Sequence, residues 1–332
     1  TVPSAQNAGT MFGLLDVDSW PIFVRFNQNT TIQEEVAQRL GRIYREAGFR
    51  FVYFDGAEDT HPPYWYNVSR SQLTVYRNLQ PEPLFAEGAC KSHFSWHMLT
   101  RGNAFDTFRP EVIKEAVRKH QAAEASLLAK DFTSLDFGWI GYFPPGDNTI
   151  GIQPDMLEYV TSRAAAWDCV ISLVGVLDQL KSHPRTSDNL EVIRRWEEAR
   201  ATGLLTNRQK EALRNLDQEH FLYLNERGGF ELIPYDHLPD VAGENSPVRA
   251  FIYERAGKIC VVYWHTSGEG TIRIPLTSDT VKLYEDPGKQ IPLQSGQTDV
   301  LLPAGKRRYL EFTLSRDKVI MAFNQAKIVS TR

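Results

Sequence analysis

Two kinds of periodicity along the chain constrain its fold more than any other feature of the sequence. Between about residues 30 and 225, helical patterns alternate with short apolar runs, and this order of strand, loop, helix and strand predicts parallel βα units. We expect strands of this kind at residues 11–15, 49–54, 83–88, 132–139, 167–173 and 221–224.

Local helix signals support the same interpretation. Residues 31–34 form a capping box, in which a hydroxyl and a carboxyl satisfy the first amides of a helix. We expect this helix to turn one apolar side toward the core, made of Val36, Leu40, Ile43 and Ala47. Further helix starts are predicted at Pro110, at Pro154 and at a second capping box, residues 206–209.

The pattern changes at about residue 245, where short strands follow one another with turn residues between them. The predicted strands are 250–254, 259–264, 271–274, 281–284 and 308–312. Such a series indicates an antiparallel sandwich. We therefore predict an α/β fold with a (β/α)8 TIM-type barrel as catalytic domain in residues 1–242, followed by a β-sandwich domain in residues 243–332.

The count of strands does not complete the barrel, which needs eight βα units. At most six strands are found before residue 243. Either irregular segments hide the others, or the first units lie in an N-terminal portion upstream of Thr1. The second alternative is preferred because the chain begins at Thr1 and not at methionine.

Composition excludes several classes of partner. The formal net charge of the 332 residues is −4, which gives no electrostatic reason to expect nucleic acid. No run reaches the ~18 apolar residues that a membrane span needs. The three cysteines match no zinc or redox spacing, and no cofactor and no metal are expected. Aromatic residues make up 11%, which fits either a sugar-binding cleft or a large core.

Two carboxylates end consecutive predicted strands, and each is followed by glycine. They are Asp55, after Phe-Val-Tyr-Phe, and Glu87, after Leu-Phe-Ala. Neighbouring strands lie ~5 Å apart, so their end residues can flank one bond. Glycoside hydrolysis needs such a pair, one carboxyl to protonate the leaving oxygen and one to attack or to activate water. The alternative is that one or both cap the following loop.

Further polar and aromatic residues could bind a substrate near these carboxylates. The candidates are Glu58, Trp65, His93, Trp96, His97, Arg101, Trp139 and Asp168. His93 and His97 would share one side of a helix and could instead hold a metal. Trp139 and the nearby Tyr142 could stack on a sugar or pack in the core. Asp168 could equally be a residue at a helix–strand boundary.

At Phe51–Asp55 and Leu84–Gly88 the chain resembles retaining glycoside hydrolases of the endo-α-N-acetylgalactosaminidase type, within the α-galactosidase-like barrels. The resemblance covers roughly residues 49–100 and implies Asp55 as nucleophile and Glu87 as acid/base. The Gly-Ala-Glu-Asp sequence after Asp55 and the histidines after Glu87 depart from that pattern. These departures leave the sugar open.

The sequence thus predicts a secreted, periplasmic or lysosome-like glycoside hydrolase that cleaves an α-linked bond in an oligosaccharide or polysaccharide. Glu87 must then start protonated near neutral pH, which the nearby charge of Asp55 would favour. Two other functions fit the same residues. One is a metal-dependent hydrolase that uses His93 and His97, and the other is a glycan-binding protein without catalysis.

Overall fold

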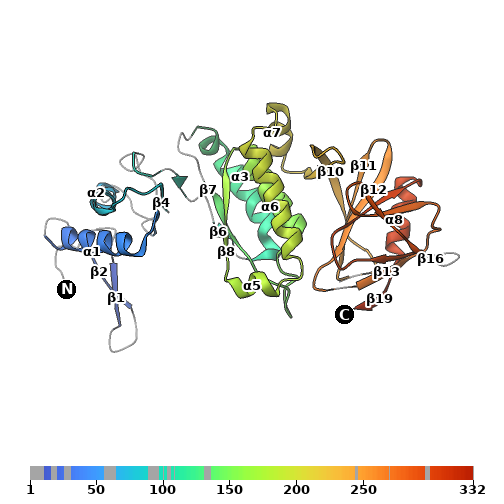
Figure 1. The fold of residues 1–332 in the computed structure, drawn as a ribbon, viewed down its shortest axis with the longest axis horizontal. Helices are drawn as coiled ribbons and strands as arrows, with labels where there is room; N and C mark the ends of the chain where they lie inside the picture. Colours follow the sequence, from blue (N-terminus) through green and yellow to red (C-terminus); the bar gives the residue numbers. More distant parts are fainter. Residues whose placement is uncertain are drawn as a thin grey trace. The chain divides into compact units, whose positions relative to one another are not determined.

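The computed structural model describes residues 11–15, 21–25, 31–55, 65–88, 97–99, 101–102, 106–107, 109–130, 136–243, 246–268, 270–295 and 300–331. The chain divides into two compact units. Unit 1 comprises residues 1–106 and 130–138, and unit 2 comprises residues 107–129 and 139–332. Figure 1 shows the elements of each unit.

Unit 1 begins with a two-stranded hairpin. Strand β1 (Met11–Leu15) pairs antiparallel with β2 (Pro21–Arg25). The strand at residues 11–15 was predicted correctly, but its place in a parallel series was wrong. Hydrophobic pattern alone marks a strand, whereas its direction depends on the partner beside it.

The rest of the described part of unit 1 is built of parallel βα units. Helix α1 (Thr31–Ala47) is followed by β3 (Phe51–Phe54), α2 (Trp65–Asn78), β4 (Phe85–Gly88) and the short β5 (Arg101–Gly102). β3 pairs parallel with β4, and β4 pairs parallel with β5. The prediction of parallel strands is therefore confirmed for residues 51–54 and 85–88.

Helix α1 begins at Thr31, as the capping box predicted, but its buried side differs from the expected one. Gln33, Ala37, Gly41 and Tyr44 are buried, while Leu40 and Ile43 are exposed. The physical reason is close packing between helices. A Cβ atom on Gly41 would lie 2.2 Å from the carbonyl oxygen of Asn78 in α2, so the two helices approach each other over the small residue.

Unit 2 contains a helical layer. The helices are the short η1 (Pro110–Val112), α3 (Ile113–Lys130), α4 (Pro154–Ala166), α5 (Leu177–Ser182), α6 (Thr186–Ala201) and α7 (Asn207–Arg214). Strands β6 (Asp106–Thr107), β7 (Asp136–Gly141) and β8 (Val170–Val174) form a three-stranded sheet, and the division between the units falls within β6 and β7. The starts at Pro110, Pro154 and Thr206 are confirmed.

Two antiparallel sheets follow. Seven strands pair in the order β15-β14-β18-β12-β11-β10-β9, and four pair in the order β16-β17-β13-β19. The strands of the larger sheet are β9 (Glu219–Leu224), β10 (Phe230–Leu238), β11 (Val248–Arg255), β12 (Lys258–His265), β14 (Val281–Asp286), β15 (Lys289–Ile291) and β18 (Arg308–Phe312). Those of the smaller sheet are β13 (Gly270–Ile274), β16 (Gln294–Ser295), β17 (Val300–Pro303) and β19 (Lys327–Thr331). Helix α8 (Arg316–Asn324) lies between β18 and β19 in sequence.

The strand predicted at residues 221–224 is β9, but it pairs antiparallel with β10, so its place in the parallel series was wrong. The seven-stranded sheet therefore contains strands from both sides of position 243. The antiparallel strands predicted after residue 245 are confirmed in β11, β12, β13, β14 and β18.

Both faces of the seven-stranded sheet are buried. On one face, residues such as Ile252 and Leu310 share a core with Ile272 of the smaller sheet and Phe323 of α8. On the other face, a mainly aromatic cluster includes Phe221, Phe251 and Trp264. Trp264 donates to the side chain of Gln153, the residue before α4, so this face meets the helical layer.

The strands of the described residues form no closed eight-stranded barrel, since β3–β5 and β6–β8 are separate three-stranded sheets. The predicted barrel stays a prediction. Within the part of the chain that the structure describes, no helix is both long and apolar enough to span a membrane.

Candidate functional site

The two predicted catalytic carboxylates lie on adjacent parallel strands of unit 1. Glu87 of β4 is in register with Tyr53 of β3 on one side and with Arg101 of β5 on the other. Asp55 follows directly after β3, two residues beyond Tyr53. Parallel strands turn paired residues toward the same face, and side chains alternate along a strand. Continued by one residue beyond β3, this alternation would turn Asp55 toward the same face as Glu87, at the carboxyl end of this sheet.

The register also sets the separation of the two residues. One strand spacing across the sheet and two residues along it give about 8 Å between the Cα atoms of Asp55 and Glu87. Aspartate and glutamate side chains can bring their carboxyl groups closer together than their Cα atoms or hold them at a similar distance. The arrangement is compatible with two carboxyl groups that act on one substrate bond.

The opposite face of this sheet is occupied by the two helices. Val52 and Phe54 of β3 pack against a core that contains Ala37 and Tyr44 of α1 and Val75 of α2. Ala86 of β4 lies in a second cluster, with which Leu73 and Tyr76 of α2 pack. Since the helices cover this face, the residues that alternate with Val52, Phe54 and Ala86 point away from them.

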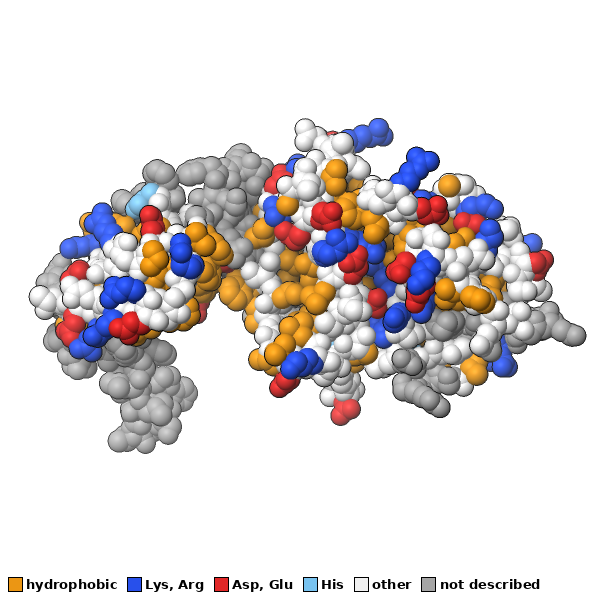
Figure 2. Space-filling view, viewed as in Figure 1, with side chains coloured by type: hydrophobic (Ala, Val, Ile, Leu, Met, Phe, Trp, Pro, Cys, Tyr) orange, Lys and Arg blue, Asp and Glu red, His pale blue; other side chains and the backbone are white. Residues whose placement is uncertain are grey.

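The face that carries the carboxylates is apolar at the start of its strands. Phe51 and Phe85 pair in register, and their ring centroids lie 4.7 Å apart. Both rings are partly exposed, at 37% and 41%. Figure 2 shows hydrophobic side chains at the surface of this unit. The strands thus lead from an apolar end to a polar end that bears Asp55 and Glu87.

The two carboxyl groups have different surroundings. Glu87 is fully buried, with 0% of the residue exposed, whereas Asp55 is exposed. Burial in a medium of low dielectric disfavours the charged form of a carboxyl, and contact with water favours it. The two candidate residues thus differ in their access to water.

The remaining predicted residues are distributed over the chain. Glu58, His93 and Trp96 lie outside the described residues. Trp65 is the first residue of α2, and Arg101 opens β5. His97 is exposed in a turn, so the helix expected to carry both His93 and His97 does not extend through His97. In the described ranges, no group of three or more His, Cys, Asp and Glu could hold a metal ion.

Two candidates lie in later elements. Asp168 has a positive φ of 58° in the turn between α4 and β8, and its carboxylate accepts two hydrogen bonds from Lys210 Nζ, at 2.7 and 2.8 Å. It is the boundary residue that the alternative interpretation expected. Trp139 is in β7 and is partly buried. Tyr142 is buried and its hydroxyl meets Thr186 at 2.8 Å, so for Tyr142 the core alternative holds.

Sequence reasoning missed a group of buried charges that joins α4 to the seven-stranded sheet. Asp155 accepts hydrogen bonds from Arg249, at 2.9 and 2.7 Å, and Lys114 Nζ lies 2.8 Å from it. One turn later in α4, Glu158 accepts from Arg307 at 2.9 Å and from the indole of Trp196 at 2.6 Å. Two acids three residues apart in a mainly apolar helix were the only local signal, because their partners are distant in sequence.

These contacts fix the ionisation of Asp155. Burial alone would raise the pKa of its carboxyl, but the charges of Arg249 and Lys114 outweigh this and hold the pKa well below its usual range. Asp155 is thus a charged partner inside unit 2, and the carboxyl oxygens of both Asp155 and Glu158 are already engaged. They join two layers of unit 2 and leave the carboxylates of unit 1 as the better candidates for chemistry.

Comparison with known proteins gives similarity at low level. No protein-family model matches the chain, and no curated protein matches it. Similar solved structures include a β-L-arabinopyranosidase of Geobacillus stearothermophilus (10% identity, TM-score 0.31, 85% of this chain and 62% of that one). Others are a family 39 glycoside hydrolase of Bacteroides cellulosilyticus (12%, 0.33, 87% and 64%) and an α-amylase of Geobacillus thermoleovorans (10%, 0.33, 90% and 67%).

The structures named here are glycoside hydrolases, and the chain spans less than two thirds of the first two. At these TM-scores the similarity assigns no family to the chain. The function proposed below is therefore based on the chain's own residues.

Proposed function

We propose that the chain is a glycoside hydrolase that cleaves an α-linked bond in a glycan with retention of configuration. Asp55 attacks the anomeric carbon while Glu87 gives its proton to the leaving oxygen, so the glycosidic C–O bond breaks as the glycosyl–Asp55 bond forms. Glu87 then takes a proton from water, the water oxygen bonds to the anomeric carbon, and Asp55 is released.

One observation carries this proposal. Buried Glu87 pairs in register with Tyr53, and exposed Asp55 follows Tyr53 by two residues, which supports one site at the carboxyl end of β3 and β4. The buried group, Glu87, is suited to the acid role, and the exposed group, Asp55, to the nucleophile role. Arg101, in register with Glu87 on β5, is proposed as a substrate-binding residue of the same site.

The first test is turnover of a panel of aryl α- and β-glycosides and natural glycans by the full chain, with Asp55→Asn and Glu87→Gln in parallel. General acid–base catalysis is worth roughly 10²–10⁴ in rate. We expect both variants to lose at least that factor in kcat. Glu82→Gln is the matched control, because Glu82 is an exposed glutamate five residues before Glu87. Full activity in Asp55→Asn would refute the assignment.

A second measurement separates the two roles. A leaving group of low pKa needs little protonation, so Glu87→Gln should retain far more activity on dinitrophenyl than on alkyl glycosides. Azide can replace a missing nucleophile, so Asp55→Ala with azide should form a glycosyl azide of inverted configuration. Product NMR in the wild-type reaction should show retention. Equal losses with both leaving groups would exclude Glu87 as the acid.

A further inference from the structure

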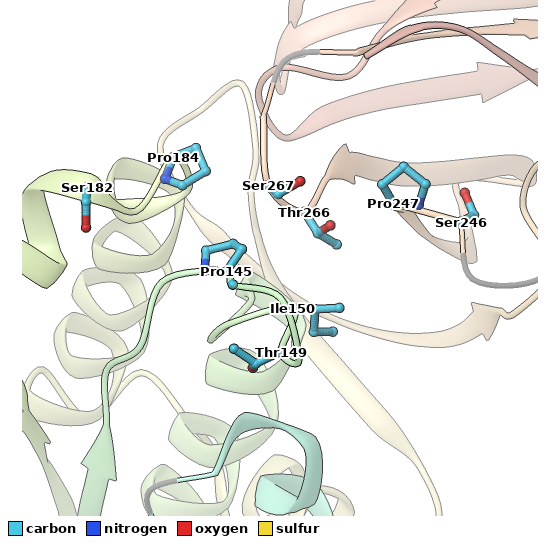
Figure 3. Close-up of a pocket in the computed structure, with 10 residues that line it drawn as sticks. Pro145, Thr149, Ile150, Ser182, Pro184, Ser246, Pro247, Thr266 and Ser267 are labelled. Carbon is cyan, nitrogen blue, oxygen red and sulfur yellow. The ribbon is translucent and has the colours of Figure 1, made fainter. Parts of the chain in front are cut away.

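Unit 2 contains a cavity of about 390 Å³ that the proposed reaction does not use. Figure 3 shows residues of the β7–α4 loop, the end of α5, the segment before β11 and the turn after β12 around one space. This volume is at the small end of the range for ligand-binding pockets. It is large enough for one or two sugar rings.

The lining of the cavity is uncharged and rich in hydroxyl groups. Five of the lining residues carry a hydroxyl, namely Thr149, Ser182, Ser246, Thr266 and Ser267. The apolar part of the wall comes from prolines and Ile150. A hydroxyl can donate one hydrogen bond and accept two, as the hydroxyls of a sugar do, and carbon–hydrogen surfaces of a sugar ring can pack on proline and isoleucine.

Two of these hydroxyl groups can still hydrogen-bond to a ligand, one as a donor and the other as an acceptor. Ser246 Oγ accepts a hydrogen bond from the backbone amide of Val248, at 3.1 Å, and its own proton remains to be donated. Ser182 Oγ donates to the carbonyl of Gln179, at 3.3 Å, and its lone pairs remain to accept. A ligand with groups that both donate and accept would match this combination.

Two charged groups next to the cavity, Arg185 and Glu111, are engaged with protein partners. Arg185 follows the lining residue Pro184, is buried, and meets Asp188 at 3.4 Å. Glu111 accepts a hydrogen bond from the hydroxyl of Thr149. The lining therefore offers no charged side chain to compensate the desolvation of an anionic or cationic ligand.

The walls are held in place by hydrogen bonds between the segments that form them. Gln153 Nε2 donates to the carbonyl of Thr266 at 3.2 Å, and the amide of Thr266 donates to the carbonyl of Pro247 at 2.7 Å. In the β7–α4 loop, Gly151 has φ +67°, and a Cβ there would lie 2.5 Å from the nitrogen of Pro145. A site fixed in this way costs little ordering when a ligand binds.

We infer that this cavity is a binding site for a neutral hydroxylated ligand, a mono- or disaccharide unit, and that it binds without catalysis. Its lining contains no carboxylate that could transfer a proton. The uncharged, hydroxyl-rich lining defines the ligand class, and the choice of saccharides within that class rests on the proposed function. The site would hold part of a glycan substrate or its product.

The test measures binding of galactose, glucose, N-acetylgalactosamine and maltose to the full chain by saturation-transfer NMR and calorimetry, with glucuronate and inorganic phosphate as charged probes. The Asp55→Asn variant is used as well, so that turnover does not interfere. A small ligand of this kind should bind with Kd of about 1 mM. Ser182→Trp should weaken binding roughly tenfold or more by filling the cavity. Ser187→Trp is the matched control, an exposed serine of α6 outside the lining.

Saccharide binding that is lost in Ser182→Trp and retained in Ser187→Trp would support the inference, whether or not the chain shows turnover. Such binding in a chain without turnover would overturn the proposed hydrolase function and leave the binding site in place. If the chain hydrolyses a glycoside but Ser182→Trp weakens no saccharide binding, the inference is overturned and the proposed hydrolase function stands. Binding of glucuronate or phosphate in preference to neutral sugars would also overturn it.

Discussion

Buried charge is the main residue-scale feature of unit 2, and Asp155 is its clearest example. The side chain of Asp155 is fully buried and lies within 3 Å of Arg249 and Lys114. Removing one partner of a buried pair leaves the other charge uncompensated, which costs about 3–5 kcal/mol. Exposed pairs such as Arg194–Glu198 contribute about 1 kcal/mol or less.

We therefore expect Asp155→Asn to lower the free energy of unfolding by about 3 kcal/mol, measured by urea denaturation at pH 7. Glu198→Gln is the control and should change it by less than about 1 kcal/mol.

The folded pKa of Asp155 lies below its unfolded value, so the stability from ionisation is present above about pH 4 and is lost as pH falls below it. The variant should lose less stability than wild type over that acid range. An equal loss in both proteins would contradict this role of Asp155.

His183 should give a second, separate dependence of stability on pH. Burial lowers its pKa to about 4, and Nε2 lies 2.7 Å from the carbonyl oxygen of Ile152. The folded state holds the neutral ring, while the unfolded chain takes up a proton below about pH 6.5. Stability from this group is therefore present above pH 6.5 and falls as pH drops toward 4.

In the variant His183→Gln, the stability difference between pH 7 and pH 5 should shrink by about 1–2 kcal/mol relative to wild type. Chemical denaturation at the two pH values measures it, and NMR titration of the imidazole protons gives the pKa directly. A pKa near 6.5 for His183 in the folded chain would refute the expectation. The same experiment on the Asp155→Asn variant should show the His183 effect unchanged, because the two groups titrate in different ranges.

At the scale of elements, the packing of α1 against α2 depends on Gly41. Glycine inside a helix normally costs roughly 1 kcal/mol relative to alanine, so Gly→Ala usually stabilises. Here the Cβ would lie 2.2 Å from the carbonyl oxygen of Asn78, and the helices would have to separate. We expect Gly41→Ala to destabilise unit 1 by about 1–3 kcal/mol.

Hydrogen exchange of the α1 and α2 amides, together with thermal unfolding, measures this effect. Arg42→Ala is the control, since Arg42 is exposed in the same helix. Faster exchange in both helices of Gly41→Ala, and little change in Arg42→Ala, is the expected pattern. A stabilised Gly41→Ala protein would mean that the contact with Asn78 is not as close as described.

The sequence predicted elements best where the signal is local. The starts of α1, η1, α4 and α7 followed from capping boxes and prolines, which act within one turn. The buried side of α1 was wrong because large apolar residues were taken as the core, whereas the contact is made over a glycine. Helices α5, α6 and α8 were not predicted. Strands β1 and β9 were assigned to the wrong kind of pairing, since direction depends on a distant partner.

The candidate site shows the same difference between local signals, which the sequence carries, and contacts with distant residues, which it does not. Asp55 and Glu87 were predicted because each ends an apolar run, and the parallel pairing of β3 with β4 is compatible with one site, which stays a prediction. That Glu87 is buried and Asp55 exposed could not be read from the pattern. The pairs of Asp155 with Arg249 and of Glu158 with Arg307 join residues 94 and 149 positions apart, which no local signal reveals.

At the scale of the whole molecule, unit 2 has its own cores and its own buried ion pairs. We expect a fragment of residues 107–332 to fold without the rest of unit 1 and to show native near-ultraviolet circular dichroism and cooperative unfolding. It should bind saccharides in the hydroxyl-lined cavity and have no hydrolase activity, since Asp55 and Glu87 are absent. A fragment with hydrolase activity would refute the proposed catalytic pair, and an unfolded one would show that unit 2 depends on unit 1.

Helix α4 has a consequence for synthesis of the chain. All of its thirteen residues are buried, and Arg249 and Arg307, the arginine partners of Asp155 and Glu158, are synthesised later than the helix. Ribosomes add about 5–20 residues per second, so the helix is synthesised roughly 3–11 s before Leu222 of β9, its first partner in the seven-stranded sheet. During that interval Asp155 has Lys114 as its only available ionic partner among the described residues, and the mainly apolar surface of the helix can contact other unfolded segments. Yield in a cell should therefore depend on chaperones that bind nascent chains and on the rate of translation between codons 166 and 249.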